Sequence, residues 1–99
     1  MENTEFVFVN LYIMLGDADG SIDGCRVMSR KGWDKDVEEF NKYLLEKEVD
    51  EVEGESEFGT YTVSMENYEV KPCTAEEAKV LEKFLGTIQG DFRLPTEFI

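Results

Sequence analysis

The sequence predicts a small α+β domain in which an antiparallel sheet of three to four strands packs against two helices. Three observations lead to this fold class. Residues 6–15 alternate between two apolar sets, residues 33–45 repeat apolar side chains at helical spacing, and residues 74–77 carry a helix-capping signature. The elements follow in the order strand, strand, helix, one or two strands, helix. That order is typical of an antiparallel sheet with its helices largely on one face.

The composition is that of a single folded domain spanning residues 1–99. A chain of this length buries about 60 to 68% of its unfolded surface, which is enough for one modest core. Hydrophobic residues make up 41% of the chain and argue against disorder, although the net charge is −13. The apolar start has an acidic flank where a signal peptide needs a basic one, and no segment reaches the ~20 apolar residues of a membrane span. We therefore expect a soluble, cytoplasmic protein that does not bind membranes.

The strand at residues 6–15 should form the structural centre of the sheet. One face carries Phe6, Phe8, Tyr12 and Met14, and the other carries Val7, Val9, Leu11, Ile13 and Leu15. A strand that is apolar on both sides is central in its sheet or covered on both faces. The second face therefore needs a cover, either the C-terminal tail or a second copy of the chain in a homodimer. Turn residues at 16–21 then lead into a weaker strand at residues 22–29, which predicts a hairpin.

The turn after this strand has some resemblance to a calcium-binding EF-hand loop. Asp17, Asp19 and Gly20 fit such a loop when Gly20 takes its sixth position. Leu15 and Arg26 then occupy the first and last ligand positions, where the loop needs oxygen ligands. We therefore predict an Asp- and Gly-rich hairpin turn and no metal site. The remaining candidates for magnesium-dependent chemistry are three aspartates: Asp17, Asp19 and Asp23.

Residues 33–45 predict an amphipathic helix. Trp33, Val37, Phe40 and Leu44 recur at i, i+4, i+7 and i+11, and Tyr43 and Leu45 widen this apolar stripe. Asp34 is the expected N-cap. The acids that follow it would then lie in the early turns, where the helix dipole favours negative charge: Asp36, Glu38 and Glu39. The helix should end near residues 46–48.

Four bases precede and begin this helix: Arg26, Arg30, Lys31 and Lys35. They have two interpretations. Either they pair with part of the acidic segment that follows and reduce its self-repulsion, or they are exposed bases at a strand-to-helix junction. A nucleic-acid site here is not expected on a chain with this net charge.

The most unusual segment is residues 46–57, which hold seven acidic side chains and one lysine. Residues 36–70 as a whole hold twelve acids and two bases, so most of the net charge lies there. Glu51, Glu53, Glu55 and Glu57 recur at every second residue, about 6.6 Å apart on one side if the segment is extended. Val52 is the one apolar residue between them, so the segment is expected to be an edge strand or a loop. Like charges on an edge strand also block strand addition by another chain.

The next segment predicts one or two strands. Tyr61, Val63 and Met65 alternate with polar residues, as in a half-buried strand. Residues 68–71 either continue this strand through a bulge or form another one after a turn. In both cases Pro72 is expected to end the strand.

The C-terminal third predicts a helix and a packed tail. Thr74 and Glu77 have the form of a capping box at the start of the helix. Gly86 is suited to end it. Apolar residues within 87–99 keep the tail available for packing, so we do not expect it to be free.

Candidate catalytic groups are few. The chain has no histidine, which removes the commonest base at neutral pH and the usual partner of a nucleophilic serine or cysteine. Cys25 and Cys73 are far apart and form no CxxC motif, so they indicate neither zinc nor redox chemistry. Two buried free thiols are expected rather than a disulfide. We therefore expect no enzyme activity, no cofactor and no metal.

The charge pattern favours an inhibitory protein that occupies a nucleic-acid-binding surface on its partner. Carboxylates would take the place of phosphates, and long-range attraction would make association fast and salt-sensitive. Duplex DNA carries one charge per ~1.7 Å of axis, so acids of the preceding helix are needed as a second row. The expected partner-binding residues are all acidic: Asp36, Glu38, Glu39, Glu46, Glu48, Asp50, Glu51, Glu53, Glu55 and Glu57. The expected partner is a basic nucleic-acid-binding protein or a nuclease, and direct binding to nucleic acid is not expected.

In its size and acidity, the chain resembles phage-encoded DNA mimics, such as anti-restriction, anti-CRISPR and uracil-DNA glycosylase inhibitor proteins. This resemblance implies an anti-defence role and carries over no residue. An immunity protein that neutralises a nuclease toxin is an alternative, and it predicts one cognate partner that is bound tightly.

Two further alternatives come from other functional classes. A structural or accessory domain, whose acidity serves solubility and edge protection, predicts that reversing the charge of Glu51, Glu53, Glu55 and Glu57 changes no interaction. An enzyme would show turnover with Mg²⁺ that Asp17→Asn or Asp19→Asn abolishes.

Overall fold

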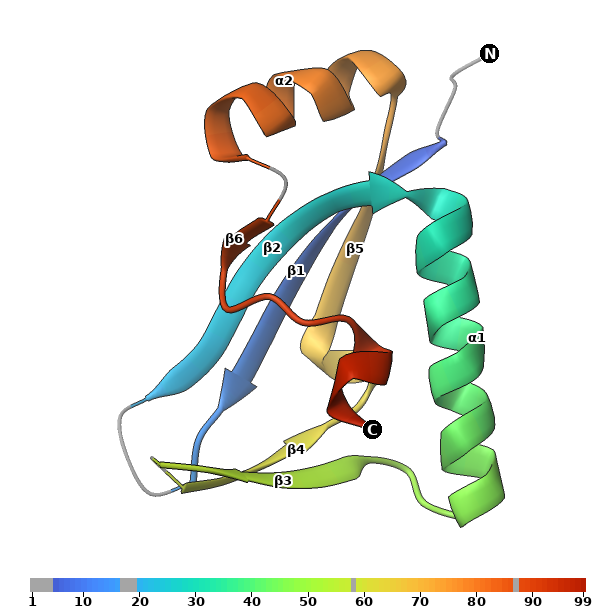
Figure 1. Ribbon diagram of the computed structural model, residues 1–99, viewed down its shortest axis with the longest axis vertical. Coiled ribbons are helices and arrows are strands. Elements are labelled where there is room, and N and C mark those ends of the chain that lie inside the picture. Colours follow the sequence, from blue (N-terminus) through green and yellow to red (C-terminus); the bar gives the residue numbers. More distant parts are fainter. Residues whose placement is uncertain (1–4, 17–19, 58, 87) are drawn as a thin grey trace.

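The computed structural model describes residues 5–16, 20–57, 59–86 and 88–99, which form the α+β fold that the sequence predicts (Figure 1). The strands are β1 (Phe6–Met14), β2 (Ser21–Ser29), β3 (Val52–Ser56), β4 (Gly59–Val63), β5 (Tyr68–Cys73) and β6 (Ile88–Gly90). The helices are α1 (Arg30–Lys47) and α2 (Ala75–Leu85), with two short 3₁₀ helices, η1 (Met65–Asn67) and η2 (Pro95–Phe98). Four antiparallel strands form the main sheet in the order β5-β1-β2-β6, and β3 and β4 form a separate hairpin. In the described part of the chain, no helix combines the length and apolar character needed to cross a membrane.

β1 is a central strand of the main sheet, because it pairs with β2 on one side and with β5 on the other. Its hairpin with β2 runs from Phe6 opposite Ser29 to Met14 opposite Ser21, which confirms the predicted hairpin. Successive side chains of a strand point to opposite faces of the sheet. We call the side of the odd-numbered β1 residues the first face and the side of the even-numbered residues the second face.

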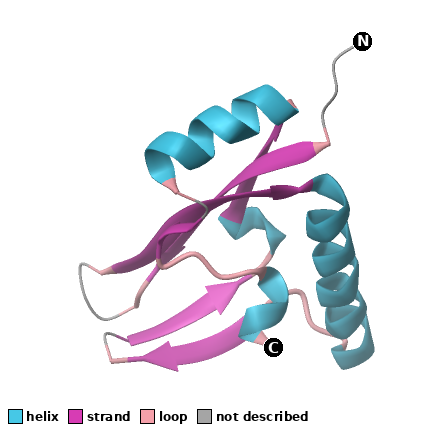
Figure 2. Ribbon diagram, turned by 45° about the horizontal axis from the view of Figure 1, so that its top comes forward, coloured by secondary structure: helices cyan, strands magenta, loops and turns pink. Residues whose placement is uncertain are grey.

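The first face is covered by α1 and by the C-terminal tail (Figures 1 and 2). The odd-numbered residues of β1 are buried there against an aromatic cluster. Tyr68 lies at the centre of this cluster, with its ring centroid 5.3 Å from that of Trp33 and 6.1 Å from that of Phe92. The Tyr68 hydroxyl donates a hydrogen bond to the carbonyl of Arg93, and burial raises the pKa of this tyrosine. The cluster therefore joins α1, β5 and the tail in one core.

α2 packs on the second face, so the prediction that both helices lie largely on one face is wrong. Val27, Cys73 and Ala78 form a small buried cluster there with Phe6 and Phe8. α2 has 11 residues and is about 16 Å long, whereas the nine residues of β1 span about 30 Å. The helix is therefore too short to cover the strand. Farther along β1, the even-numbered residues are exposed, and the tail that could have covered them lies on the first face.

The N-cap of α1 is Ser29 and not the predicted Asp34. The Ser29 hydroxyl accepts a hydrogen bond from the Gly32 N–H at 3.1 Å. β2 thus runs into α1 without a connecting loop, and the first turn of the helix contains no acid. The predicted acids lie beyond that turn, where the helix dipole has little effect, so the dipole role expected for them is wrong.

α1 ends at Lys47, within the predicted range. Glu48 follows in the left-handed conformation, with φ at 55°. The N–H groups of Glu48 and Val49 donate to the carbonyls of Leu45 and Leu44, which closes the helix end. Glycine is the residue that usually takes this position, because a Cβ is strained there. The Leu45 side chain is exposed and does not widen the apolar stripe as predicted.

The acidic segment forms an edge strand, which was one of the two predicted alternatives. β3 pairs with β4 from Val52 opposite Val63 to Ser56 opposite Gly59. The hairpin is attached to the end of β1 by a hydrogen bond from the Gly16 N–H to the Thr60 carbonyl at 3.0 Å. It is also docked through the Tyr61 ring, whose centroid lies 6.1 Å from that of Phe98.

β5 and α2 follow the predictions with one exception. Thr74 and Glu77 form the capping box, since each side chain accepts a hydrogen bond from the other residue's backbone N–H. Gly86 ends α2 with φ at 77°. β5 does not end at Pro72 but continues to Cys73. Pro72 is tolerated because β5 is an edge strand, where a backbone donor on the outer side is not needed.

The C-terminal tail packs on the sheet, as predicted. β6 pairs with β2, with Gly24 opposite Gly90, and the Asp91 N–H donates to the Asp23 carbonyl at 2.8 Å. A Cβ on Gly24 would lie 2.5 Å from two backbone atoms of the tail. The close crossing of β2 and the tail therefore requires glycine at this position.

Glu48→Gly is expected to stabilise the protein by roughly 0.5 to 1 kcal/mol, because it relieves the strained left-handed position. Glu46→Gly is the matched control, since it removes the same charge inside the helix and should cost roughly 0.5 to 1 kcal/mol. Urea unfolding followed by circular dichroism measures both changes. Effects of the same sign would contradict the C-cap assigned to Glu48.

Gly24→Ala is expected to destabilise the protein by roughly 1 to 3 kcal/mol, because the new methyl group would lie 2.5 Å from backbone atoms of the tail and force them to shift. The tail should also loosen, which amide hydrogen exchange at Asp91 would show as faster exchange. An unchanged urea midpoint, with unchanged exchange at Asp91, would contradict the close crossing.

Candidate functional site

The negative charge of the protein is concentrated along one edge, which follows α1 and includes β3. α1 itself has five bases and five acids and is neutral overall. Residues 48–57 have six acids and no base, and these six side chains are exposed. We call them the acidic edge: Glu48, Asp50, Glu51, Glu53, Glu55 and Glu57.

The acids of α1 do not extend the acidic edge as a second row. Glu38, Glu39 and Glu46 are exposed, as expected for partner-binding residues. However, Lys35 and Lys42 lie three or four positions from them, which places the lysines beside them on the helix surface. Charges interleaved in this way form no continuous row of negative charge.

Asp36 is engaged in an internal contact. Its carboxylate accepts hydrogen bonds from the Thr96 N–H at 3.1 Å and from the Thr96 hydroxyl at 2.6 Å. Asp36 thereby satisfies an N–H at the start of η2 and ties the tail to α1. Both of its oxygens are occupied, so it is not part of the free acidic surface.

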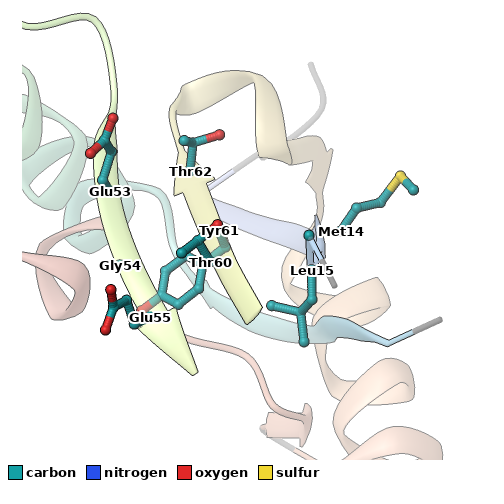
Figure 3. A pocket seen from close by; sticks show the side chains of 9 residues that line it. Met14, Leu15, Glu53, Gly54, Glu55, Thr60, Tyr61 and Thr62 are labelled. Carbon is teal, nitrogen blue, oxygen red and sulfur yellow. The ribbon is translucent and has the colours of Figure 1, made fainter. Parts of the chain in front are cut away.

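Glu53 and Glu55 project from the same side of β3 because they are two residues apart (Figure 3). Their cross-strand neighbours on β4 are Thr62 and Thr60, which add hydroxyl groups and no charge. Tyr61 packs against the core from the opposite side of the hairpin. A shift of the pairing by one residue would turn the carboxylates toward that core, so the alternation along β3 determines which side is acidic.

The acidic edge has no ion-pair partner among the described residues. The one ion pair found among the described residues lies on β5, where the Lys71 ammonium is 3.4 Å from the Glu69 carboxylate. The four bases that could have paired with the acidic segment form no ion pair with it in the described part of the chain: Arg26, Arg30, Lys31 and Lys35. The structure agrees with the second interpretation of these bases, because three of them are exposed where β2 meets α1: Arg30, Lys31 and Lys35. The repulsion within the acidic edge is therefore not balanced by pairing inside the described protein.

The structure adds a second surface, which lies on the second face of β1 beyond α2. Tyr12 and Met14 are exposed there by 56% and 72%. An open hollow of about 730 Å³ lies between Met14 and the β3–β4 hairpin, and another of about 500 Å³ lies between Met14 and β5. Both hollows are lined by Met14 and Thr62, so they adjoin each other.

Acidic side chains surround this apolar centre. Glu53 and Glu55 line the first hollow, and Glu66 and Glu69 line the second. A third hollow of about 420 Å³, beside Tyr12, is lined by one further acid. Among the described residues that line these three hollows, there is no lysine and no arginine. We call this surface the acid-rimmed face: Tyr12, Met14, Asp23, Glu53, Glu55, Glu66 and Glu69.

The alternation of residues 6–15 places Tyr12 and Met14 on one face of a strand but does not mark them as site residues. The sequence did carry a signal for an uncovered surface, because the second apolar face of β1 is longer than one short helix can cover. Glu66 and Glu69 had no comparable signal. Glu69 reaches this surface through the pairing of β5 with β1, where it lies opposite Asn10, and no local pattern specifies that pairing.

The described residues form no group of three or more carboxylates or thiols that could hold a metal ion. Asp17 and Asp19, two of the magnesium candidates, lie outside the described residues. Asp23 accepts a hydrogen bond from the Ser21 hydroxyl at 2.7 Å. Cys25 and Cys73 are free and buried, as predicted, and burial raises the pKa of both thiols. A raised pKa keeps a thiol protonated and weakly nucleophilic.

Comparison with known proteins finds no family model, no curated protein and no solved structure that matches this chain. Two surfaces of the protein bear on function, the acidic edge and the acid-rimmed face. They share Glu53 and Glu55, and the described charged side chains of both surfaces are acidic.

Replacing both Glu53 and Glu55 by Gln is expected to raise the free energy of unfolding by about 0.5 kcal/mol at low ionic strength, because the repulsion between the two carboxylates is removed. The gain should largely vanish at 1 M salt, where the Debye length is about 3 Å. Urea unfolding at both salt concentrations measures it.

The matched control for this experiment is Glu38→Gln with Glu39→Gln, which removes two charges beside lysines and should give no gain. If the control stabilises the protein as much, the effect belongs to the total charge and not to the acidic edge.

Proposed function

We propose that the protein is a non-catalytic binding protein whose acidic edge occupies a basic, nucleic-acid-binding surface of a partner protein. The observation that carries this proposal is the acidic edge itself, six exposed acids with no base among them and no ion pair in the described part of the chain. In the free protein no ion pair among the described residues offsets the repulsion between these charges. Against a basic surface they are attracted, and the attraction also speeds association.

Protection of a strand edge explains only part of the acidic edge. β3 is the outer strand of a two-stranded sheet, and charges on such a strand prevent another chain from pairing with it. Glu53 and Glu55 lie on β3 and serve this purpose. The other four acids lie before or after β3, where there is no strand edge to protect. Binding to a basic partner gives these four acids a role.

The spacing of the carboxylates supports replacement of individual phosphates rather than a copy of duplex DNA. Glu53 and Glu55 are about 6.6 Å apart along β3, whereas duplex DNA has one charge per ~1.7 Å of axis. A copy of duplex DNA would need the acids of α1 as a second row of negative charge, but these acids are interleaved with lysines. We therefore assign each exposed carboxylate of the edge to one Lys or Arg of the partner's nucleic-acid site, as a charge-assisted hydrogen bond.

Affinity capture from a bacterial lysate tests the proposal, with the protein immobilised at about 50 and about 200 mM salt. We expect a nucleic-acid-binding protein or a nuclease to be retained, to be displaced by added DNA, and to fall at least about tenfold in recovery at the higher salt. A variant with Gln at Glu51, Glu53, Glu55 and Glu57 should retain about a tenth of it or less.

The control variant carries Gln at four exposed acids outside the acidic edge: Glu38, Glu39, Glu76 and Glu82. It has the same net charge as the edge variant and should capture the partner as the unmodified protein does. If all three proteins capture the same set, the acidity serves solubility and edge protection, and the proposal is refuted. Capture of one nuclease alone would identify an immunity protein, whereas capture of a DNA-binding host protein would identify a DNA mimic.

A further inference from the structure

We infer that the acid-rimmed face receives a positively charged segment of the partner that also carries a large apolar or aromatic side chain, which contacts Tyr12 and Met14. This inference rests on the proposed function and deepens it, because it names the chemistry of the bound segment. Its basis is a pair of exposed apolar side chains at the centre of a surface on which every charged lining residue described is acidic.

The apolar centre has the position of an interface anchor. Tyr12 and Met14 are two residues apart on the same side of β1, so their side chains are neighbours, about 6.6 Å apart along the strand. β1 is a central strand of the main sheet, and Met14 lines both the hollow beside the β3–β4 hairpin and the hollow beside β5. Binding energy in protein interfaces is concentrated on a few central side chains, and aromatic residues and Met are enriched there within a polar rim. The acid-rimmed face has this arrangement.

The rim supplies carboxylates on both sides of the anchor. Glu53 and Glu55 come from β3, Glu66 comes from η1, and Glu69 comes from β5. Glu69 is paired with Lys71, whereas the other three have no ion pair in the described part of the chain. A single bound segment can therefore place a cation on either side of its apolar residue and meet a carboxylate at each position.

The charge of the rim also argues against other occupants. A second copy of this chain would place acids against acids, which costs affinity. An uncharged apolar segment would remove the carboxylates from water without supplying a counter-charge, which is also costly. The C-terminal tail is held on the first face by its packing against α1 and the main core. A cationic segment with an apolar side chain satisfies both the rim and the centre.

A second exposed apolar pair on α2 serves as the comparison. Val80 and Phe84 are exposed by 53% and 74%, close to the values for Tyr12 and Met14. Their surroundings differ in charge from the acid-rimmed face, because α2 carries two lysines as well as three glutamates, and the Lys83 ammonium lies 5.8 Å from the centre of the Phe84 ring. This pair therefore lacks the uniformly acidic rim that surrounds Tyr12 and Met14.

Two short synthetic peptides test the inference. Both carry the same number of arginines, and one has two tryptophans where the other has two alanines. Titration of the ¹⁵N-labelled protein, followed by NMR at about 50 mM salt, measures the affinity and locates the contact. We expect the tryptophan peptide to bind about tenfold more tightly, with the largest shifts at residues 12–14. In the Tyr12→Ser/Met14→Ser variant the two peptides should bind equally.

The control variant Val80→Ser/Phe84→Ser should keep the preference for the tryptophan peptide. The inference is overturned if the unmodified protein binds both peptides equally, a comparison that depends on no variant. It is also overturned if the preference survives in the Tyr12/Met14 variant or is lost in the α2 variant. Failure of the proposed function is a separate result, because it would appear in the lysate capture, where the edge variant would retain the same proteins as the unmodified protein.

Discussion

β1 is apolar on both sides, and the need to cover both of its faces organises the rest of the chain. β2 and β5 satisfy its backbone hydrogen bonds, while α1 and the tail cover the first face with an aromatic cluster around Tyr68. On the second face, α2 is long enough to cover only the half of the strand that contains Phe6 and Phe8. Tyr12 and Met14 remain exposed. The acid-rimmed face thus begins where the covering of β1 ends.

The negative charge of the described chain lies largely apart from the main core. α1 packs on the core and is neutral overall, whereas the unpaired acids lie on β3 and on its flanks, outside the main sheet. The hairpin is docked through β4, by Tyr61 and by the hydrogen bond between Gly16 and Thr60. β3 therefore contributes little to the main core. Its carboxylates stay in water, where the cost of repulsion is lowest.

The errors of prediction have specific physical causes. Ser29 and Asp34 are both good N-cap residues, and the choice between them depends on β2 continuing directly into the helix, which local pattern does not reveal. Pro72 was expected to end a strand, but it lies on the outer strand of the sheet, and strand order is a tertiary property. Asp36 belongs by sequence to the acidic surface, yet the folding of the tail brings Thr96 to its carboxylate.

The sequence by itself determined the fold class, the first hairpin and the two helices, the apolar character of both faces of β1, the capping box of α2 and the placement of negative charge within residues 48–57. These properties follow from periodicity and composition, which act over a few neighbouring residues. The sequence did not determine the full order of strands, because three strands lie between the helices and β6 follows α2. Only the tertiary structure decided which helix covers which face and which acids gather around Tyr12 and Met14. Glu66 and Glu69 reach that surface because β5 pairs with β1 across more than fifty residues, and the surface is open because α2 is shorter than the strand it covers. The pairing of β5 with β1 and the docking of α2 on the second face both join parts of the chain that are remote in sequence.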